Sequence, residues 1–103
     1  MSCLVEFSMS PLDKGASVGD YVARCLEVVA ASGLPYQFHA MGTILEGEWS
    51  QCMQVIEQCY ERLGSDCARV TCAIKIDARQ GDSGRLASKV QRVEKRLGRK
   101  LTT

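Results

Sequence analysis

The most informative segment of the sequence is Tyr36-Gln37-Phe38-His39-Ala40-Met41-Gly42-Thr43-Ile44-Leu45-Glu46-Gly47-Glu48-Trp49. Its first half alternates apolar and polar side chains, which is typical of a half-buried strand. Gly42 permits a tight turn, and Ile44-Leu45 then resumes the apolar pattern as a short return strand. A helical pattern begins at Glu48. The stretch therefore predicts a hairpin that leads directly into a helix, with polar groups beside apolar ones where the two strands meet.

The residues before the hairpin predict one strand and one helix. Residues 3–9 alternate between apolar and mixed positions, which favours a strand, and Pro11 and Gly15 end it. Apolar residues then recur at steps of three and four, as on one face of a helix. Ser17 is the expected N-cap of this helix, and Gly33 is its expected end.

The residues after the hairpin predict a helix, a strand and a further helix. The helix runs from Glu48 to about Leu63, and its expected buried stripe is Trp49, Met53, Ile56, Tyr60 and Leu63. Residues 68–77 alternate most regularly of all and predict the clearest strand. Residues 80–84 are expected to form a loop. An amphipathic helix follows, with its apolar face formed by Leu86, Val90, Val93 and Leu97.

The predicted order is strand, helix, strand, strand, helix, strand and a final helix. This pattern indicates an α+β domain over residues 1–103, a ferredoxin-like βαββαβ sandwich with an additional C-terminal helix. Right-handed crossovers place both main helices on one face of the sheet. The residues expected on that face are Val5, Phe7, Phe38, Val70, Cys72 and Ile74. The opposite face is mixed, and the last helix alone is available to cover it, so homo-oligomerisation is expected.

The cysteine usage favours free thiols over a disulfide framework or a metal centre. The six cysteines are Cys3, Cys25, Cys52, Cys59, Cys67 and Cys72. Most of them occupy apolar phases, no Cys-x-x-Cys pair exists, and a single histidine is too few for common zinc patterns. The N-terminus lacks the basic region of a secretory signal, and no apolar run is long enough to span a membrane. We therefore expect a cytoplasmic protein without a bound metal or cofactor.

The charge distribution is uneven along the chain. Residues 1–84 carry 6 basic and 11 acidic side chains, whereas residues 85–103 carry seven basic side chains and one acidic one. Such a basic tail is compatible with nucleic acid or an acidic membrane. Because no aromatic residues interleave with the charges, we instead expect a solvated helix face, and no nucleic-acid or membrane partner.

Several short motifs together resemble the thiamine-binding protein family. The matching segments are Ser10-Pro11-Leu12, Ser17-Val18, Ser32-Gly33-Leu34, Met41-Gly42-Thr43, Glu46-Gly47-Glu48 and Ile76-Asp77-Ala78-Arg79. The most specific part is Met-Gly-Thr-x-x-Glu-Gly, and the resemblance covers about residues 3–97. It implies a ferredoxin-like fold, homotetramers whose sheets meet, and non-catalytic binding of thiamine or its hydroxymethylpyrimidine moiety.

Five side chains are candidates for contacting such a ligand: Ser10, Tyr36, Met41, Thr43 and Glu46. The carboxylate of Glu46 can accept from an aminopyrimidine, and the hydroxyls of Ser10 and Thr43 are short hydrogen-bonding groups. Tyr36 or Met41 can pack on a flat ring.

Structural interpretations of the same residues remain open. Glu46 could assist a helix N-terminus, Thr43 could serve the hairpin, and Tyr36 could belong to the core.

Catalysis is not favoured by the sequence. Nucleophilic catalysis needs a base beside the nucleophile, and His39 is the single histidine. No glycine-rich phosphate loop is present. The alternative to ligand binding is a structural or interaction protein whose sheet-mediated assembly is itself the function.

Overall fold

The computed structural model describes residues 1–81 and 83–103, and it confirms the predicted ferredoxin-like fold. Seven elements follow one another along the chain: β1 (Ser2–Pro11), α1 (Gly19–Ala31), β2 (Tyr36–His39), β3 (Gly42–Glu48), α2 (Trp49–Gly64), β4 (Val70–Arg79) and α3 (Arg85–Leu97). The strands form one antiparallel sheet in the order β2-β3-β1-β4. Asp82, within the predicted loop 80–84, lies outside the described residues.

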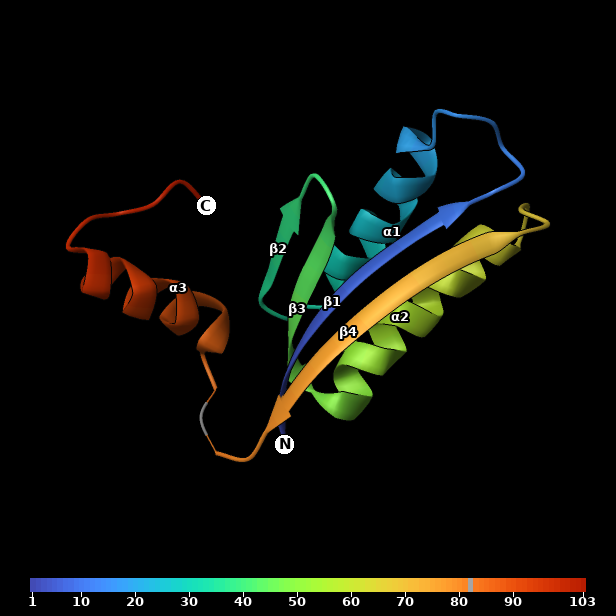
Figure 1. The fold of residues 1–103 in the computed structure, drawn as a ribbon. Coiled ribbons are helices and arrows are strands. Elements are labelled where there is room, and N and C mark those ends of the chain that lie inside the picture. The colour runs from blue at the N-terminus through green and yellow to red at the C-terminus, as the bar shows by residue number, and fades with distance from the viewer. Residues whose placement is uncertain (82) are drawn as a thin grey trace.

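The two main helices share one face of the sheet, and α3 stands apart from them. Figure 1 shows α1 and α2 together behind the long, curved strands β1 and β4, with α3 beyond the β2 side of the sheet. We call the face that α1 and α2 leave uncovered the open face. The register of β1 with both neighbours places Leu4, Glu46 and Asp77 in one row across it.

The core lies between β1 and the two helices. Every second side chain of β1, from Cys3 to Met9, is buried against them, as alternation along a strand requires. Four of the six free cysteines belong to the core, where a thiol packs as a small hydrophobic group. These are Cys3, Cys25, Cys52 and Cys59.

The buried stripe of α2 differs from the predicted one. Its buried residues are Cys52, Val55, Ile56, Cys59 and Leu63, whereas Trp49 and Tyr60 are more than half exposed. Both stripes have helical spacing and share Ile56 and Leu63, so the helix is rotated by less than one residue step from the expected orientation. The small thiols allow α2 to pack closely on the sheet, and the two large rings lie at its flanks.

The start of α1 is also different from the prediction. The helix begins at Gly19, and the N-cap is Val18, whose side chain makes no capping hydrogen bond, so Ser17 is not the cap. The backbone N–H groups at the start of α2 have side-chain partners, because Glu48 and Gln51 form a reciprocal capping box. The backbone N–H of Glu48 donates to Oε1 of Gln51 at 2.9 Å.

The residues of β4 take the expected parity but not the expected burial. Cys72 and Ile74 pair with Met9 and Phe7 and so lie on the helix side of the sheet, yet both are exposed. Phe38, at the opposite edge in β2, is also exposed. The reason is that β2 and β4 are edge strands, which two helices only partly cover.

Gly42 offers a test of the hairpin geometry. An added Cβ at this position would lie 2.8 Å from the backbone oxygen of Phe7, which is too close for any side chain. We expect Gly42→Ala to lower the free energy of unfolding by about 1–3 kcal/mol, the usual cost of overpacking, in urea titrations. Gly64→Ala is the matched control, because nothing lies within 4 Å of that Cβ. Equal stability of the two variants would contradict the tight contact.

Candidate ligand-binding site

A cavity of about 590 Å³ opens between the C-terminal half of β1, the N-terminal half of α1 and the β2–β3 turn. Ligand sites for small molecules usually enclose about 300–1,000 Å³, so its size suits a compact organic ligand. Its walls are mainly apolar and sulfur-containing, and they include Phe7, Met9, Val22, Leu26, Phe38 and Met41. Such a lining favours a flat ring over a highly charged ligand.

The cavity exists because β1 continues beyond its pairing with β3. β3 pairs with β1 from Ser2 to Phe7, whereas β4 pairs with it from Ser2 to Pro11. Beyond Phe7, β1 therefore pairs with no strand of the described residues on its β3 side. Backbone groups on an unpaired strand edge are strong hydrogen-bonding groups. This unpaired edge gives an otherwise apolar cavity a polar side.

His39 lines the same cavity, and contacts on both of its ring nitrogens fix the orientation of the ring. Its Nδ1 accepts a hydrogen bond from the backbone N–H of Met41 at 3.2 Å. Because Nδ1 accepts, the ring proton belongs on Nε2, which lies 3.3 Å from Oε2 of Glu6. The pair places a carboxylate close to the cavity, although none of the described lining residues is itself acidic.

The structure divides the five predicted ligand contacts between two places. Ser10, Met41 and Thr43 line the cavity: Thr43 is 3% exposed, and Met41, at 82% exposed, forms part of the rim. Tyr36 and Glu46 do not reach it. They line a second hollow, a groove of about 580 Å³ between β2 and α3.

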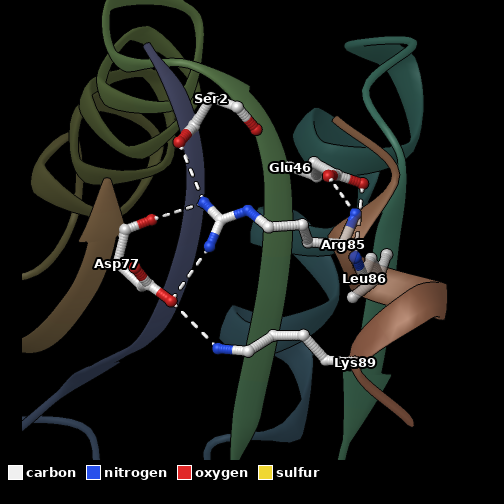
Figure 2. A network of polar contacts seen from close by, with 6 residues as sticks. All are labelled: Ser2, Glu46, Asp77, Arg85, Leu86 and Lys89. Atoms are coloured by element: carbon white, nitrogen blue, oxygen red, sulfur yellow. Dashed lines mark hydrogen bonds and ion pairs between the residues drawn. The ribbon is translucent and has the colours of Figure 1, made fainter. Parts of the chain in front are cut away.

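Glu46 caps the N-terminus of α3 rather than that of α2. Its carboxylate accepts hydrogen bonds from the backbone N–H groups of Arg85 at 2.7 Å and Leu86 at 3.5 Å (Figure 2). A carboxylate at a helix N-terminus is stabilised by the exposed N–H groups and by the helix dipole. Glu46 is 6% exposed, so this contact replaces the water that the carboxylate would otherwise bind.

Arg85 extends from that cap across the open face. Figure 2 shows its guanidinium reaching from the Glu46 side to Asp77, and the side chain is 3% exposed. The guanidinium donates to Oδ2 of Asp77 at 3.0 Å, to the Asp77 carbonyl oxygen at 3.1 Å and to the Ser2 carbonyl oxygen at 2.9 Å. One buried arginine thus ties α3 to β1 and β4. Because the Asp77 side chain is half exposed, solvent screens part of its attraction to the buried guanidinium.

Lys89 adds an exposed ion pair to the same carboxylate. Its Nζ lies 2.9 Å from Oδ2 of Asp77. This hydrogen bond, together with Arg85, holds the pKa of Asp77 below its usual value of 3.8. Because the folded-state pKa is lowered, the stabilisation is present above about pH 4 and is lost as the pH falls through the lowered pKa.

Several lining residues were not predicted as site residues. Val18, Val22 and Leu26 recur at every fourth position from the N-cap of α1 onward, beside the buried positions Cys25 and Val29. Together the two rows make the apolar face of α1 wider than packing on the core requires. This extra width is the sequence signal that could have indicated the cavity wall.

The sequence model of the thiamine-binding protein family matches residues 5–94. The chain belongs to this family. The UPF0045 protein Mb1933 of Mycobacterium bovis is 41% identical over 98 residues, which cover 94% of this chain and 96% of the relative. The UPF0045 protein sll0230 of Synechocystis sp. is 34% identical over 95 residues, covering 91% and 78%.

Two solved structures share the fold. The hypothetical protein MJ1052 of Methanocaldococcus jannaschii is 32% identical, with a TM-score of 0.77 over 94% of this chain and 96% of that one. The protein TM0486 of Thermotoga maritima has a TM-score of 0.76 over 90% and 99%, but at 19% identity the likeness concerns the fold alone. The match to the thiamine-binding protein family spans both the cavity and the first turns of α3.

Within residues 1–81 and 83–103, no three His, Cys, Asp or Glu side chains are grouped as a metal site requires. No helix of that described part is long and apolar enough to cross a bilayer.

The capping role of Glu46 is testable with Glu46→Gln. The amide keeps the shape and an acceptor oxygen but loses the charge, and charged hydrogen bonds exceed neutral ones by about 1 kcal/mol. We expect amide hydrogen exchange at Arg85 and Leu86 to accelerate by roughly fivefold, with little change in β1. Glu57→Gln, on an exposed position of α2, is the control. Unchanged exchange at the start of α3 would contradict the cap.

Proposed function

We propose that this protein binds thiamine or its hydroxymethylpyrimidine moiety, without transforming it, in the cavity between β1, α1 and the β2–β3 turn. The observation that carries the proposal is the unpaired edge of β1 beyond Phe7, set in an apolar cavity. An aminopyrimidine is a flat ring with a row of donors and acceptors along its rim. It can pack its faces on apolar walls while its rim meets strand backbone.

The side chains around that edge supply matching polar groups. Thr43 and Ser10 offer hydroxyls, and both line the cavity. Met41, at the rim, can pack over a ring. For thiamine itself, the cationic thiazolium would lie toward the mouth, where Glu6 pairs with His39. The Thermotoga maritima neighbour, whose name connects it with thiamine biosynthesis or salvage, is consistent with this ligand class.

Binding without catalysis is favoured by the state of His39. Cys25 and His39 line the same cavity, which is a combination that nucleophilic enzymes use. However, Nδ1 of His39 accepts from Met41 N–H and Nε2 faces Glu6. The ring therefore offers no free nitrogen to activate the thiol.

Tyr36 and Glu46 would contact a ligand only in the second groove, beside α3. Because the Glu46 carboxylate already caps α3, we assign the ligand to the first cavity. The groove beside α3 is the alternative location of the ligand. Substitutions in the cavity and in the groove distinguish the two locations.

We further propose that the protein acts as a homo-oligomer, as a tetramer in the cytoplasm. The open face of the sheet is mixed in character and only partly covered, and the exposed residues Val93 and Leu97 of α3 are apolar surface that a second copy would cover. The chain's seven basic residues after position 84 complement the acidic surplus of residues 1–84 in such an assembly. Six free thiols suit a reducing compartment.

Calorimetric titration with hydroxymethylpyrimidine and with thiamine tests the ligand site. Ala23→Phe places a ring in the cavity and is expected to weaken binding about tenfold or more, or at least 1.4 kcal/mol. Ala30→Phe is the matched control, because the same change on an exposed position of α1 leaves the cavity open. Glu46→Gln should leave the affinity nearly unchanged.

Two results would contradict this assignment. Absence of heat for both ligands at near-millimolar concentration would oppose the binding function. Loss of affinity in Glu46→Gln, with Ala23→Phe unaffected, would move the ligand to the groove beside α3.

Analytical ultracentrifugation, combined with the calorimetry, distinguishes a ligand-binding protein from a structural protein whose assembly is its function. We expect a tetramer, and we expect Leu97→Glu to dissociate it because a charge would enter the apolar contact. Ser50→Glu, on an exposed position of α2, should not. A monomeric wild type would contradict the oligomer, whereas a tetramer without ligand affinity would support the structural alternative.

A further inference from the structure

Two buried cysteines lie in contact where α1 packs on α2. Cys25 is 3% exposed and Cys59 is fully buried. Sγ of Cys59 lies 3.6 Å from the carbonyl oxygen of Cys25, so the thiol of Cys59 lies against the Cys25 residue. Both cysteines are free. The contact therefore joins two cysteines that lie on different helices and are 34 positions apart in the sequence.

Cys25 differs from the other core thiols because it lines the cavity. A hydrogen bond from Cys59 lowers the pKa of the Cys25 thiol, although burial acts in the opposite direction. The same hydrogen bond, and then burial, raises the pKa of Cys59. Cys52 is buried outside the cavity lining, and burial raises its pKa to about 11. Cys25 is thus the thiol of the core that a small molecule can reach and that ionises more readily than its partner.

We propose that Cys25 and Cys59 form a redox-active pair, which a hydroperoxide entering the cavity oxidises to a disulfide between α1 and α2. This goes beyond ligand binding and does not depend on it, because the oxidant itself is the reacting molecule.

The reaction has two balanced steps. The thiolate of Cys25 attacks one peroxide oxygen, an S–O bond forms, the O–O bond breaks, and the leaving oxygen takes up a proton to become water. The sulfur of Cys59 then attacks the sulfenic sulfur of Cys25, an S–S bond forms, the S–O bond breaks, and a second water leaves. Two thiols are oxidised and one hydrogen peroxide is reduced to two waters.

The product would change the cavity that Cys25 lines. A disulfide fixes α1 against α2 and removes the thiol from the cavity wall. Any molecule that occupies the cavity would also stand between the peroxide and Cys25. The pair thereby connects the oxidation state of the protein with the space available in the cavity.

Mass spectrometry of the full chain after treatment with hydrogen peroxide tests the proposal. Trypsin leaves residues 25–62 in one peptide that holds Cys25, Cys52 and Cys59, so cleavage after glutamate is needed to separate them. The expected product is a cross-link between peptides 25–27 and 58–61, at least about tenfold more abundant than any cross-link to Cys52. In Cys59→Ser, Cys25 should stop at the sulfenic acid, which a dimedone-type reagent traps.

Matched variants keep the test decisive. Cys52→Ser removes another buried thiol of α2 and should leave the cross-link unchanged, and so should Cys72→Ser on β4. Cys25→Ala and Cys59→Ala, checked by thermal unfolding, replace the serine variants if those fail to fold. The proposal is overturned by oxidation confined to the exposed Cys72, by a cross-link that Cys72→Ser abolishes, or by equal labelling of Cys25 and Cys52.

Discussion

The fold is organised around β1, an inner strand that pairs with β4 from Ser2 to Pro11 along one edge and with β3 from Ser2 to Phe7 along the other. Its odd-numbered side chains must then all enter the core, and its even-numbered ones must all face the open side. A shift by one residue would exchange the two faces. The helices α1 and α2 follow, since they can bury their apolar faces only on the odd-numbered side.

The same strand creates the candidate site by being longer than one of its neighbours. β4 accompanies it to Pro11, whereas β3 begins opposite Phe7, so the last part of β1 has an unpaired edge under α1. Backbone groups along an unpaired strand edge need hydrogen-bond partners, which is a general reason for such an edge to attract a ligand. At the other end of β1, Arg85 satisfies the Ser2 carbonyl and fastens α3. The two ends of one strand thus serve different purposes.

Patterns of alternation and helical spacing were sufficient to predict the ferredoxin-like order of elements, because these patterns depend on local side-chain direction alone. They were not sufficient for the burial of α2. Trp49, Tyr60, Cys52 and Cys59 are all apolar, and which of them pack inward depends on the space between helix and sheet. The small thiols fit there and the rings do not.

The candidate site shows the same limit. The Met-Gly-Thr turn was found from its motif, and Met41 and Thr43 do line the cavity. Glu46 lies in the same motif, but its contact with α3 joins residues about 40 positions apart, which no local spacing reveals. The unpaired edge of β1 likewise follows from unequal strand lengths and becomes visible only in the register.

The exposed position of Trp49 has a practical consequence for studies in solution. Trp49 is the single tryptophan of the chain, and this residue is 53% exposed at the start of α2. Because this residue is already half exposed in the folded protein, its fluorescence emission changes less on unfolding than that of a buried tryptophan. The same emission responds directly to anything that covers the start of α2, which makes this residue a reporter of surface contacts rather than of folding.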